Sequence, residues 1–243
     1  MKRAILFDFG GTLDWPAHWL DRFLAHYRAA SFELDRVTLD RAFSAATQSA
    51  YRTAYRMRDF NLEATIRYLV SYQLASLREA DDRLRDTIDA IGAEVMESTI
   101  SASFAAESRA GLAASRTVLE GLTERFHVGI VSNFYGNLDR ILDEAGLLTL
   151  ISFVADSSRL RIFKPDPGIF TAALDGMGAY PASTLMVGDS LSKDCAPARA
   201  LGMRAVWLRH RIPGPDADAH SGGTADFTIE ALAELEHLKW MEG

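Results

Sequence analysis

Polar residues suited to phosphate or metal chemistry follow an apolar run at the start of the sequence. The run Ala4–Phe7 leads directly into Asp8, and Gly10, Gly11 and Thr12 come next. A carboxylate at the carboxyl end of a buried strand lies where open α/β sheets bind ligands, which suits a nucleophile or a metal ligand. The two glycines let backbone N–H groups turn toward an anion, and Thr12 adds a hydroxyl donor. A structural role, with Asp8 as a cap and the glycines as a plain turn, explains this short stretch equally well.

Further polar residues follow other predicted strands and turns. Ser132-Asn133 ends an apolar run, Lys164 lies in a loop before a predicted helix, and Asp189 follows another apolar run, with Asp194 close behind. The carboxyl ends of parallel strands share one edge of a sheet. We therefore expect these side chains to converge on Asp8.

The residue types at these positions complement one another. Asp8 and Asp189 offer oxygen ligands for a hard cation, and Mg²⁺ usually takes one or two carboxylates together with phosphate and water. Ser132 and Lys164 supply a hydroxyl group and a positive charge for the remaining anionic oxygens. Attack of a carboxylate on a phosphoryl group requires this neutralisation of charge on both reacting partners. The sequence thus predicts phosphoryl chemistry with Mg²⁺ as the cofactor.

Two kinds of periodicity divide the chain. Residues 15–115 show helical spacing without strand-like alternation, and Asn61 is a suitable N-cap for a helix whose apolar residues repeat between Ile66 and Leu77. Strands and helices alternate from about residue 119 onward. This alternation predicts a doubly wound parallel sheet, a Rossmann-like α/β fold. We expect an α/β core from residues 1–14 and 116–243, with residues 15–115 inserted as an all-helical cap.

The elements that position the polar residues are predicted individually. A helix begins at Asp166-Pro167, with the aspartate as N-cap and the proline in its first turn. Residues 212–224 are rich in Gly, Pro, Asp and Ser, which is typical of a surface loop. We expect a short edge strand over residues 226–229 and a closing helix over residues 230–241. Trp15 and Trp19 are expected either to wall a pocket under the cap or to pack between cap and core.

The composition restricts the class of protein. The 243 residues are 48% hydrophobic and 24% charged, which is ordinary for a globular protein. A formal net charge of -7 argues against a nucleic-acid partner, which would need a basic face. The single cysteine, Cys195, fits a reducing compartment. Without a signal peptide or an apolar run of about 18 residues, we expect a cytoplasmic protein with no membrane partner. No pattern predicts an oligomeric state.

Four segments together resemble the motifs of the haloacid dehalogenase (HAD) superfamily, in the branch with a helical cap inserted after the first strand. Taken in chain order, each segment is similar to one of the family's four motifs. They are Phe7–Leu13, Ile130–Asn133, Phe163–Phe170 and Val187–Asp194. Each motif alone is weak, whereas four in order at fitting spacing are specific. The resemblance covers nearly the whole chain.

The resemblance implies a hydrolase, a phosphatase acting on a small phosphorylated metabolite, and gives each site residue a role. Asp8 would be the nucleophile that becomes an aspartyl ester. Substrate oxygens would be held by Gly11, Thr12, Ser132, Asn133 and Lys164, of which Ser132 and Lys164 also assist catalysis. Magnesium would be bound by Asp8, Asp189 and the Gly10 carbonyl. Asp194 would support the site by orienting Lys164 or a metal-bound water.

Gly10 departs from the family's phosphatase pattern. Phosphatases of the family carry a second Asp two residues after the nucleophile, which protonates the leaving alkoxide and later activates water. General acid–base catalysis is typically worth about 10²–10⁴-fold in rate. We therefore expect slow turnover of alkyl phosphates, or a restriction to leaving groups that need no proton.

Other branches of the family offer alternatives. Dehalogenases carry an aromatic residue at this position and lack the fourth-motif aspartate, so Asp189 argues against 2-haloacid dehalogenation. Phosphonoacetaldehyde hydrolases need a cap lysine, and the sequence contains no lysine between Lys2 and Lys164. Cation-pumping ATPases span membranes, which nothing in this sequence predicts. A Mg²⁺-dependent phosphatase remains the leading hypothesis, with a catalytically weak or inactive phosphate- or metabolite-binding protein as the alternative.

Overall fold

Six parallel strands form one sheet in the computed structural model, which describes residues 3–210 and 225–242. The strand order is β3-β2-β1-β4-β5-β6. The strands are β1 (Ala4–Phe7), β2 (His127–Ser132), β3 (Phe153–Asp156), β4 (Thr184–Gly188), β5 (Arg204–Leu208) and β6 (Phe227–Ile229). The predicted edge strand over residues 226–229 is confirmed, because β6 pairs with β5 and lies at the end of this order.

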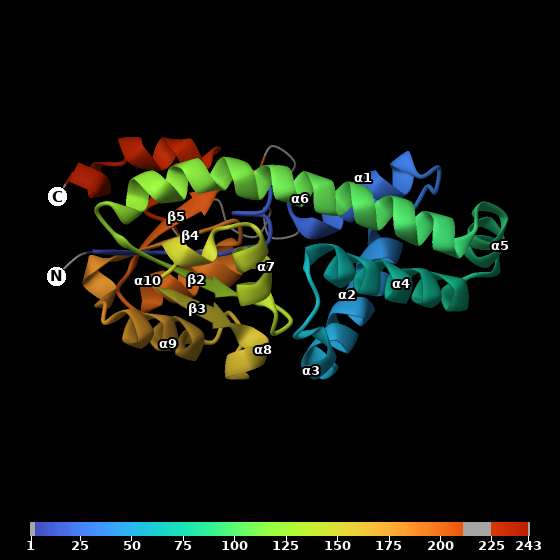
Figure 1. Cartoon of the computed structure of the whole chain (residues 1–243), viewed down its shortest axis with the longest axis horizontal. Helices are drawn as coiled ribbons and strands as arrows, with labels where there is room; N and C mark the ends of the chain where they lie inside the picture. Colours follow the sequence, from blue (N-terminus) through green and yellow to red (C-terminus); the bar gives the residue numbers. More distant parts are fainter. Residues whose placement is uncertain (1–2, 211–224, 243) are drawn as a thin grey trace.

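Strand β1 is buried on both faces, which explains its uninterrupted apolar sequence. Ile5 and Phe7 belong to the same core cluster as Leu119 of α6 (Ala93–Thr123). Leu6 belongs to a second cluster with Ile169 of α9 (Pro167–Met177). Successive side chains of a strand point to opposite faces, so the sheet lies between two helical layers (Figure 1). The predicted fold class, a doubly wound parallel α/β sheet, is confirmed.

Short helices connect the strands of this core. They are α7 (Leu138–Glu144), α8 (Ser157–Leu160), α9 and α10 (Ala196–Ala200), with 3₁₀ turns at Leu148–Leu150 and Pro181–Ser183 and a π turn at Leu191–Cys195. The N-cap predicted at Asp166 is confirmed, because its carboxylate accepts a hydrogen bond from the Gly168 N–H at 2.8 Å. Pro167 follows in the first turn, where a missing N–H costs no helical hydrogen bond.

The regular elements of the segment between β1 and β2 are all helices. Its helices are α1 (Trp19–Ala29), α2 (Arg36–Arg52), α3 (Ala54–Met57), α4 (Leu62–Ala80), α5 (Asp82–Ile91) and α6. Asn61 caps α4 as predicted, because its Oδ1 accepts the Ala64 N–H at 2.8 Å. The residues that recur at helical spacing in α4, from Ile66 to Leu77, are buried.

Helix α6 joins the helical insertion to the sheet. Its 31 residues run along both parts of the molecule in Figure 1, with α4 against its first half and β2 after its end. The helix passes residue 115 without a break, so the boundary predicted there falls inside a continuous helix. The helical insertion and the sheet are therefore joined by a continuous helix on this side, and the division at residues 14/15 and 115/116 remains a prediction.

The carboxyl-terminal segment differs from the prediction. Instead of one helix over residues 230–241, the chain forms two 3₁₀ turns, Leu232–His237 and Lys239–Glu242. Leu235 and Met241 are buried, and Trp240 packs on Phe126 at a centroid distance of 5.5 Å. The prediction was wrong because tertiary contacts with the end of α6, rather than helical propensity, set the backbone here. The loop predicted over residues 212–224 lies outside the described residues.

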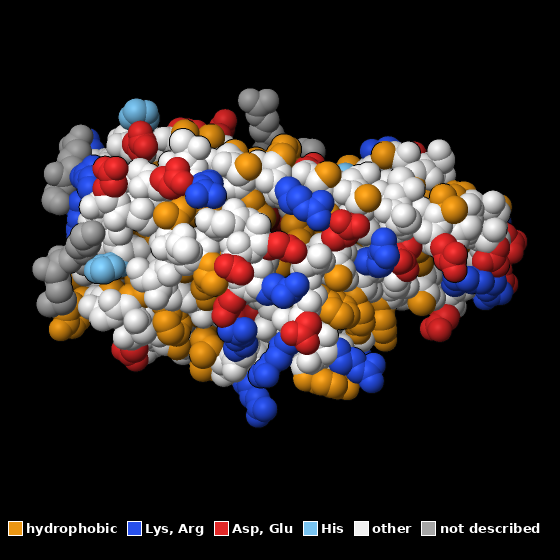
Figure 2. All heavy atoms as spheres, viewed as in Figure 1, with side chains coloured by type: hydrophobic (Ala, Val, Ile, Leu, Met, Phe, Trp, Pro, Cys, Tyr) orange, Lys and Arg blue, Asp and Glu red, His pale blue; other side chains and the backbone are white. Residues whose placement is uncertain are grey.

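Charged side chains of both signs are interspersed on the face shown in Figure 2. Ion pairs among the described residues include Arg78 with Asp89 and Arg159 with Asp139. Within residues 3–210 and 225–242, no helix combines the length and the apolar character that crossing a membrane requires.

Candidate active site

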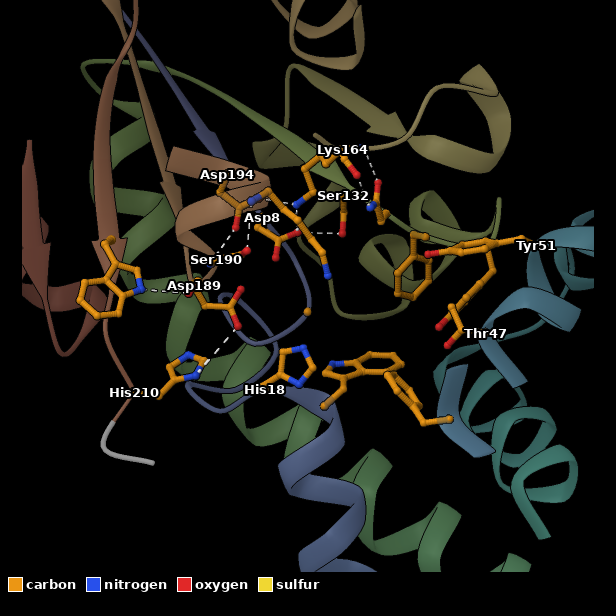
Figure 3. Close-up of a pocket in the computed structure, with 18 of the residues that line it drawn as sticks. Asp8, His18, Thr47, Tyr51, Ser132, Lys164, Asp189, Ser190, Asp194 and His210 are labelled. Carbon is orange, nitrogen blue, oxygen red and sulfur yellow. Dashed lines mark hydrogen bonds and ion pairs between the residues drawn. The ribbon is translucent and has the colours of Figure 1, made fainter. Parts of the chain in front are cut away.

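Three neighbouring strands bring polar side chains to one edge of the sheet. Asp8 follows β1, Ser132 is the last residue of β2, and Asp189 follows β4. Because β1 pairs with β2 on one side and with β4 on the other, the three residues lie next to one another. The backbone N–H of Asp8 continues this pairing by donating to the Val187 carbonyl at 2.9 Å. The predicted convergence at the carboxyl edge is confirmed in geometry (Figure 3).

Asp8, Ser132, Lys164 and Asp194 form a buried polar cluster. Lys164 Nζ donates to Asp8 Oδ1 and to Asp194 Oδ1, both at 2.7 Å. Ser132 Oγ donates to the same Asp8 Oδ1 at 2.9 Å. All four residues are buried. Two donors thus hold one oxygen of Asp8, while its Oδ2 receives no hydrogen bond from the described residues.

The electrostatics of Lys164 follow from these contacts. Burial by itself would lower the pKa of a lysine, but the carboxylates of Asp194 and Asp8 raise the pKa of Lys164 above its usual value. Lys164 therefore stays charged. It supplies a fixed positive charge beside the free oxygen of Asp8.

Asn133 holds the backbone that carries Lys164. Its Oδ1 accepts the Lys164 N–H at 2.7 Å, and its Nδ2 donates to the Lys164 carbonyl at 3.0 Å. Both ends of the amide are therefore used to position this loop. The predicted contact of Asn133 with substrate remains a prediction, although the residue lines the cavity described below.

Three carboxylates are arranged so that they can hold a cation. Ligand atoms of Asp8, Asp189 and Asp194 all lie within 4.8 Å of one another. Burial, followed by the negative charges of Asp8 and Asp194, raises the pKa of Asp189 well above its usual range. His210 Nδ1 lies 3.9 Å from Asp189 Oδ2, but burial lowers the pKa of His210 and so disfavours the charged imidazolium. These three carboxylates offer oxygen ligands and carry negative charge in excess of the positive charge near them, which suits a hard divalent cation.

Of the first-motif residues Gly10, Gly11 and Thr12, only one lines the cavity described below. Gly10 lines it, whereas Gly11 and Thr12 are absent from its lining. The Gly11 N–H donates to Asp14 Oδ1 at 2.8 Å, and the Thr12 hydroxyl is buried without a hydrogen-bond partner among the described residues. Their predicted roles in substrate binding therefore remain predictions.

The side of Gly10 that would carry a side chain faces an indole ring. A Cβ at position 10 would lie 3.2 Å from Nε1 of Trp19, which is tighter than ordinary contact. Trp19 is fixed in turn, since this nitrogen donates to Asp14 Oδ2 at 2.9 Å. The two roles expected for Trp19 are both found, because it packs on Phe134 after β2 and also lines the cavity.

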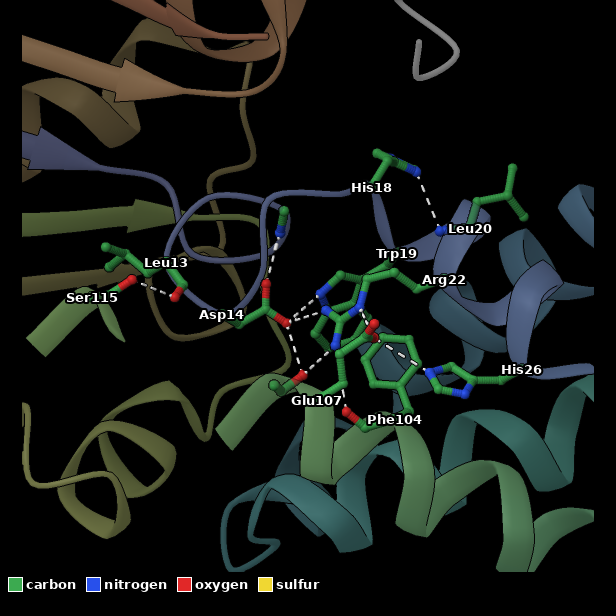
Figure 4. A network of polar contacts seen from close by, with 12 residues as sticks. Leu13, Asp14, His18, Trp19, Leu20, Arg22, His26, Phe104, Glu107 and Ser115 are labelled. Carbon is green, nitrogen blue, oxygen red and sulfur yellow. Dashed lines mark hydrogen bonds and ion pairs between the residues drawn. The ribbon is translucent and has the colours of Figure 1, made fainter. Parts of the chain in front are cut away.

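Asp14 is the centre of a network that the sequence did not reveal (Figure 4). Its Oδ2 accepts from Trp19, from Arg22 at 2.6 Å and from Ser108 at 3.0 Å. Arg22 also pairs with Glu107 of α6 at 2.7 Å. The network ties the loop after β1 to two helices of the insertion, α1 and α6. Asp14 could have been noticed as a second carboxylate near Asp8, but no local pattern identifies Arg22 or Ser108 as its partners.

A cavity of about 380 Å³ opens above the polar cluster. Its polar side includes Asp8, Ser132, Lys164 and Asp189, and its other side is formed largely by aromatic residues. The aromatic residues of this side are Trp19, Phe43, Tyr51, Phe134 and Tyr135, and Trp207 lines the cavity as well. The cap side chains among them had no sequence signal, because their spacing is that of ordinary buried helix positions.

Basic residues line another part of the same cavity. His18, Lys193, Arg209 and His210 contribute to it. His210 Nε2 donates to the Gly11 carbonyl at 2.7 Å. His18 caps α1 by accepting the Leu20 N–H on Nδ1 at 3.2 Å. Burial, and then the positive charge of Lys193, lower the pKa of His18.

The fold and the polar cluster together define a class of protein. A parallel sheet with a helical insertion after its first strand presents three aspartates, a serine and a lysine at one cavity. The chain belongs to the haloacid dehalogenase-like hydrolase family, whose sequence model matches residues 2–202. The predicted family is therefore confirmed.

Known proteins resemble this chain over limited segments. Haloacid dehalogenase-like hydrolase domain-containing protein 3 of Danio rerio is 43% identical over 83 residues, 34% of each chain. Phosphoserine phosphatase of Thermus thermophilus is 41% identical over 93 residues, 36% of this chain and 37% of that protein. The chain thus spans about a third of the length of these two relatives. A dehalogenase crystal structure shares the fold with a TM-score of 0.61 at 19% identity, covering 97% of this chain and 96% of that one.

Proposed function

We propose that the protein is a Mg²⁺-dependent phosphohydrolase that acts on a small phosphorylated metabolite through an aspartyl-phosphate at Asp8. The observation that carries this proposal is the Lys164 ammonium, which lies 2.7 Å from both Asp8 and Asp194. A fixed cation beside a carboxylate lets a second anion approach that carboxylate. The relative named as a phosphoserine phosphatase supports the same reaction class.

Each residue of the cluster has a distinct part in the proposed reaction. Asp8 Oδ2, which no described residue engages, attacks phosphorus, while Oδ1 is held in place by Ser132 and Lys164. Lys164 and Ser132 then stabilise the negative charge on the phosphoryl oxygens. Asp194 positions Lys164 rather than touching the substrate, because its Oδ1 accepts the second Lys164 hydrogen bond.

The cation would be held by Asp8, Asp189 and the carbonyl of Gly10. When bound, Mg²⁺ supplies positive charge that offsets the repulsion between the nucleophile and the phosphoryl group. The raised pKa of Asp189 supports this assignment, since a nearby cation would favour the ionised carboxylate that burial disfavours.

The experiment that tests the proposal is hydrolysis of 4-nitrophenyl phosphate with and without Mg²⁺. We expect Mg²⁺-dependent turnover that falls to the uncatalysed background in Asp8→Asn. The matched control is Asp175→Asn, which changes an exposed aspartate on α9 and should keep the wild-type rate. Equal rates in wild type and Asp8→Asn would refute the enzymatic proposal.

A weakly active phosphate-binding protein is the second candidate, and the packing of Trp19 against Gly10 favours it. No side chain at position 10 can act as the acid, and the space beside it is filled. Under this candidate, calorimetry would detect Mg²⁺-dependent binding of inorganic phosphate while turnover stays at background.

Restoring an acid at position 10 separates the two candidates. Gly10→Asp combined with Trp19→Phe supplies the carboxylate and removes the nitrogen that would lie 3.2 Å from its Cβ. For a competent enzyme that lacks only its acid, we expect a gain of about 10²-fold or more on alkyl phosphates. Trp19→Phe alone is the control. The absence of any gain would favour the binding protein.

A further inference from the structure

Besides its basic residues, the cavity has two further kinds of lining that differ chemically. Its floor at the sheet edge carries the Asp8–Lys164 cluster. Five aromatic residues of its lining, here called the aromatic wall, are Trp19, Phe43, Tyr51, Phe134 and Tyr135. Figure 3 shows Tyr51 and Thr47 projecting from α2 across the cavity from Asp8 and Ser132. A ligand whose phosphoryl group lies on the floor therefore extends toward aromatic rings.

The aromatic wall is a fixed surface. Tyr135 packs on Phe134 at 4.9 Å and on Tyr51 at 5.3 Å between ring centroids. Phe134 also meets Trp19 edge-to-face at 6.0 Å. Mutual ring contacts leave these side chains little freedom, so binding a further ring costs little conformational entropy.

The aromatic wall also carries no charge. Burial raises the pKa of Tyr51 above its usual value and raises the pKa of Tyr135 to about 12, although the Thr47 hydroxyl partly opposes the shift at Tyr135. Both phenols are therefore neutral at physiological pH. The cavity residues that α2 contributes, Phe43, Thr47 and Tyr51, are uncharged. An ammonium or carboxylate group on the ligand would find no ion-pair partner on this side, whereas an uncharged ring would find matching surface.

The lack of an acid at position 10 independently restricts which leaving groups can be cleaved. Gly10 offers no acid, and Trp19 occupies the neighbouring space. Cleavage of the P–O bond then leaves an electron pair on an oxygen that receives no proton from position 10. A phenol, with a pKa of about 10 like that of tyrosine, accepts this pair far more readily than an alcohol, whose pKa is close to the 15.7 of water.

We infer that the natural substrate is an aryl phosphate, a phosphomonoester whose leaving group is a phenolic ring bound against the aromatic wall. This inference rests on the proposed function. Asp8 Oδ2 forms the bond to phosphorus as the P–O(aryl) bond breaks, and the electron pair leaves on a phenolate that takes a proton from solvent. Water then attacks phosphorus and loses a proton to solvent. The P–O(Asp8) bond breaks, which restores the carboxylate and releases inorganic phosphate.

Four substrates test the effect of the ring separately from the effect of the leaving group. Phenyl phosphate has both features, benzyl phosphate has the ring with an alkoxide leaving group, acetyl phosphate has a good leaving group without a ring, and glycerol phosphate has neither. With Mg²⁺ present, we expect similar KM values for phenyl and benzyl phosphate but a kcat about 10²-fold or more lower for benzyl phosphate. A higher kcat/KM for glycerol phosphate than for phenyl phosphate would overturn the inference.

Variants of the aromatic wall test the ring contact directly. Tyr51→Leu, with Phe43→Leu as a second variant, replaces a ring by an apolar side chain. Each should lower the ratio of kcat/KM for phenyl phosphate to that for acetyl phosphate by about tenfold. The matched control is Tyr55→Leu on α3, an exposed tyrosine outside the cavity lining, which should leave the ratio unchanged. An unchanged ratio in both wall variants would contradict the inference.

The outcomes distinguish this inference from the proposed function. Asp8-dependent hydrolysis of acetyl phosphate without any preference for rings would support the phosphohydrolase and refute the aryl substrate. If no substrate is turned over, calorimetry with phenyl phosphate decides the question of the ring. Binding that Tyr51→Leu weakens about tenfold would support the aryl site, and equal binding by both proteins would refute it.

Discussion

At the scale of single residues, the positive charge of Lys164 compensates the buried negative charges of Asp8 and Asp194. Its ammonium lies 2.7 Å from two carboxylate oxygens that are themselves buried. Neither aspartate has a second cationic partner within hydrogen-bond distance among the described residues. Removing one member of such a buried cluster leaves uncompensated charge, which costs more than the intact cluster contributes.

Lys164→Met should therefore destabilise the fold as well as abolish activity. We expect the free energy of unfolding to fall by about 3–5 kcal/mol, because Asp8 and Asp194 are left buried and facing each other. Urea denaturation in EDTA measures this loss. Lys239→Met, at an exposed lysine, should change the stability by less than about 0.5 kcal/mol. Equal stability of the two variants would show that Lys164 does not neutralise the cluster.

His18 gives the fold a dependence on pH. Burial lowers its pKa in the folded protein, so the folded state binds this proton less readily than the unfolded chain does. Stability is then fully present above the unfolded pKa of about 6.5 and is lost as pH falls toward the lower, folded pKa. Protonation would also place a hydrogen on Nδ1, the atom that accepts the Leu20 N–H.

His18→Asn tests this dependence. Asparagine keeps an N-cap acceptor but does not titrate. We expect the loss of stability between pH 7.5 and pH 5.5, measured by urea denaturation, to be smaller in the variant than in wild type. The exposed His237, changed to Asn, serves as the control and should keep the wild-type difference. The prediction is wrong if His18→Asn keeps that difference too.

At the scale of elements, helix α6 is held against the active-site loop by direct backbone contact. A Cβ on Gly111 would lie 1.9 Å from the carbonyl oxygen of Asp14, so only glycine allows this approach. Ser115, one turn later, donates to the Leu13 carbonyl at 2.7 Å. The position of the loop after β1 is thus set by a helix whose residues follow about a hundred positions later.

Gly111→Ala should destabilise the protein, although alanine is the better helix former by about 1 kcal/mol. We expect a net loss of about 1–3 kcal/mol, because the methyl group must displace backbone atoms. Gly121→Ala on the same helix is the matched control, since its Cβ would make only ordinary contact at 3.6 Å. That variant should gain up to about 1 kcal/mol. Thermal and urea unfolding measure both, and a gain in Gly111→Ala would contradict the described packing.

At the scale of the whole molecule, the cavity is assembled from both parts of the chain. Its floor comes from the strand ends, and much of the aromatic wall comes from α1 and α2 in the insertion. A ligand that bridges the floor and the wall stabilises the folded state, because the unfolded chain has no such site.

Magnesium should therefore raise the stability of the intact protein. We expect about 2.7 kcal/mol at a Mg²⁺ concentration 100-fold above Kd, measured by urea denaturation. Asp189→Asn should lose most of this gain, because it removes a charged ligand from the carboxylate cluster. Asp175→Asn should retain it. A gain of equal size in Asp189→Asn would place the cation elsewhere.

The sequence by itself determined the order of the strands and the polar residues at the strand ends. Alternate burial of Ile5, Leu6 and Phe7 on two faces follows directly from an unbroken apolar strand. The caps Asn61 and Asp166 were predictable because a cap is a contact between residues two or three apart. These features depend on local spacing, which the sequence displays.

Only the tertiary structure decided which distant residues meet. Trp19 fills the space beside Gly10. Both ends of the Asn133 amide form hydrogen bonds with the Lys164 backbone. Tyr51 reaches the cavity from α2 because helix packing turns that face toward the sheet edge. Such contacts depend on how elements pack and which way side chains point, and no local pattern encodes either. The sequence therefore shows that position 10 lacks the acid of the family's phosphatases. Only the tertiary structure shows that Trp19 occupies the space beside it.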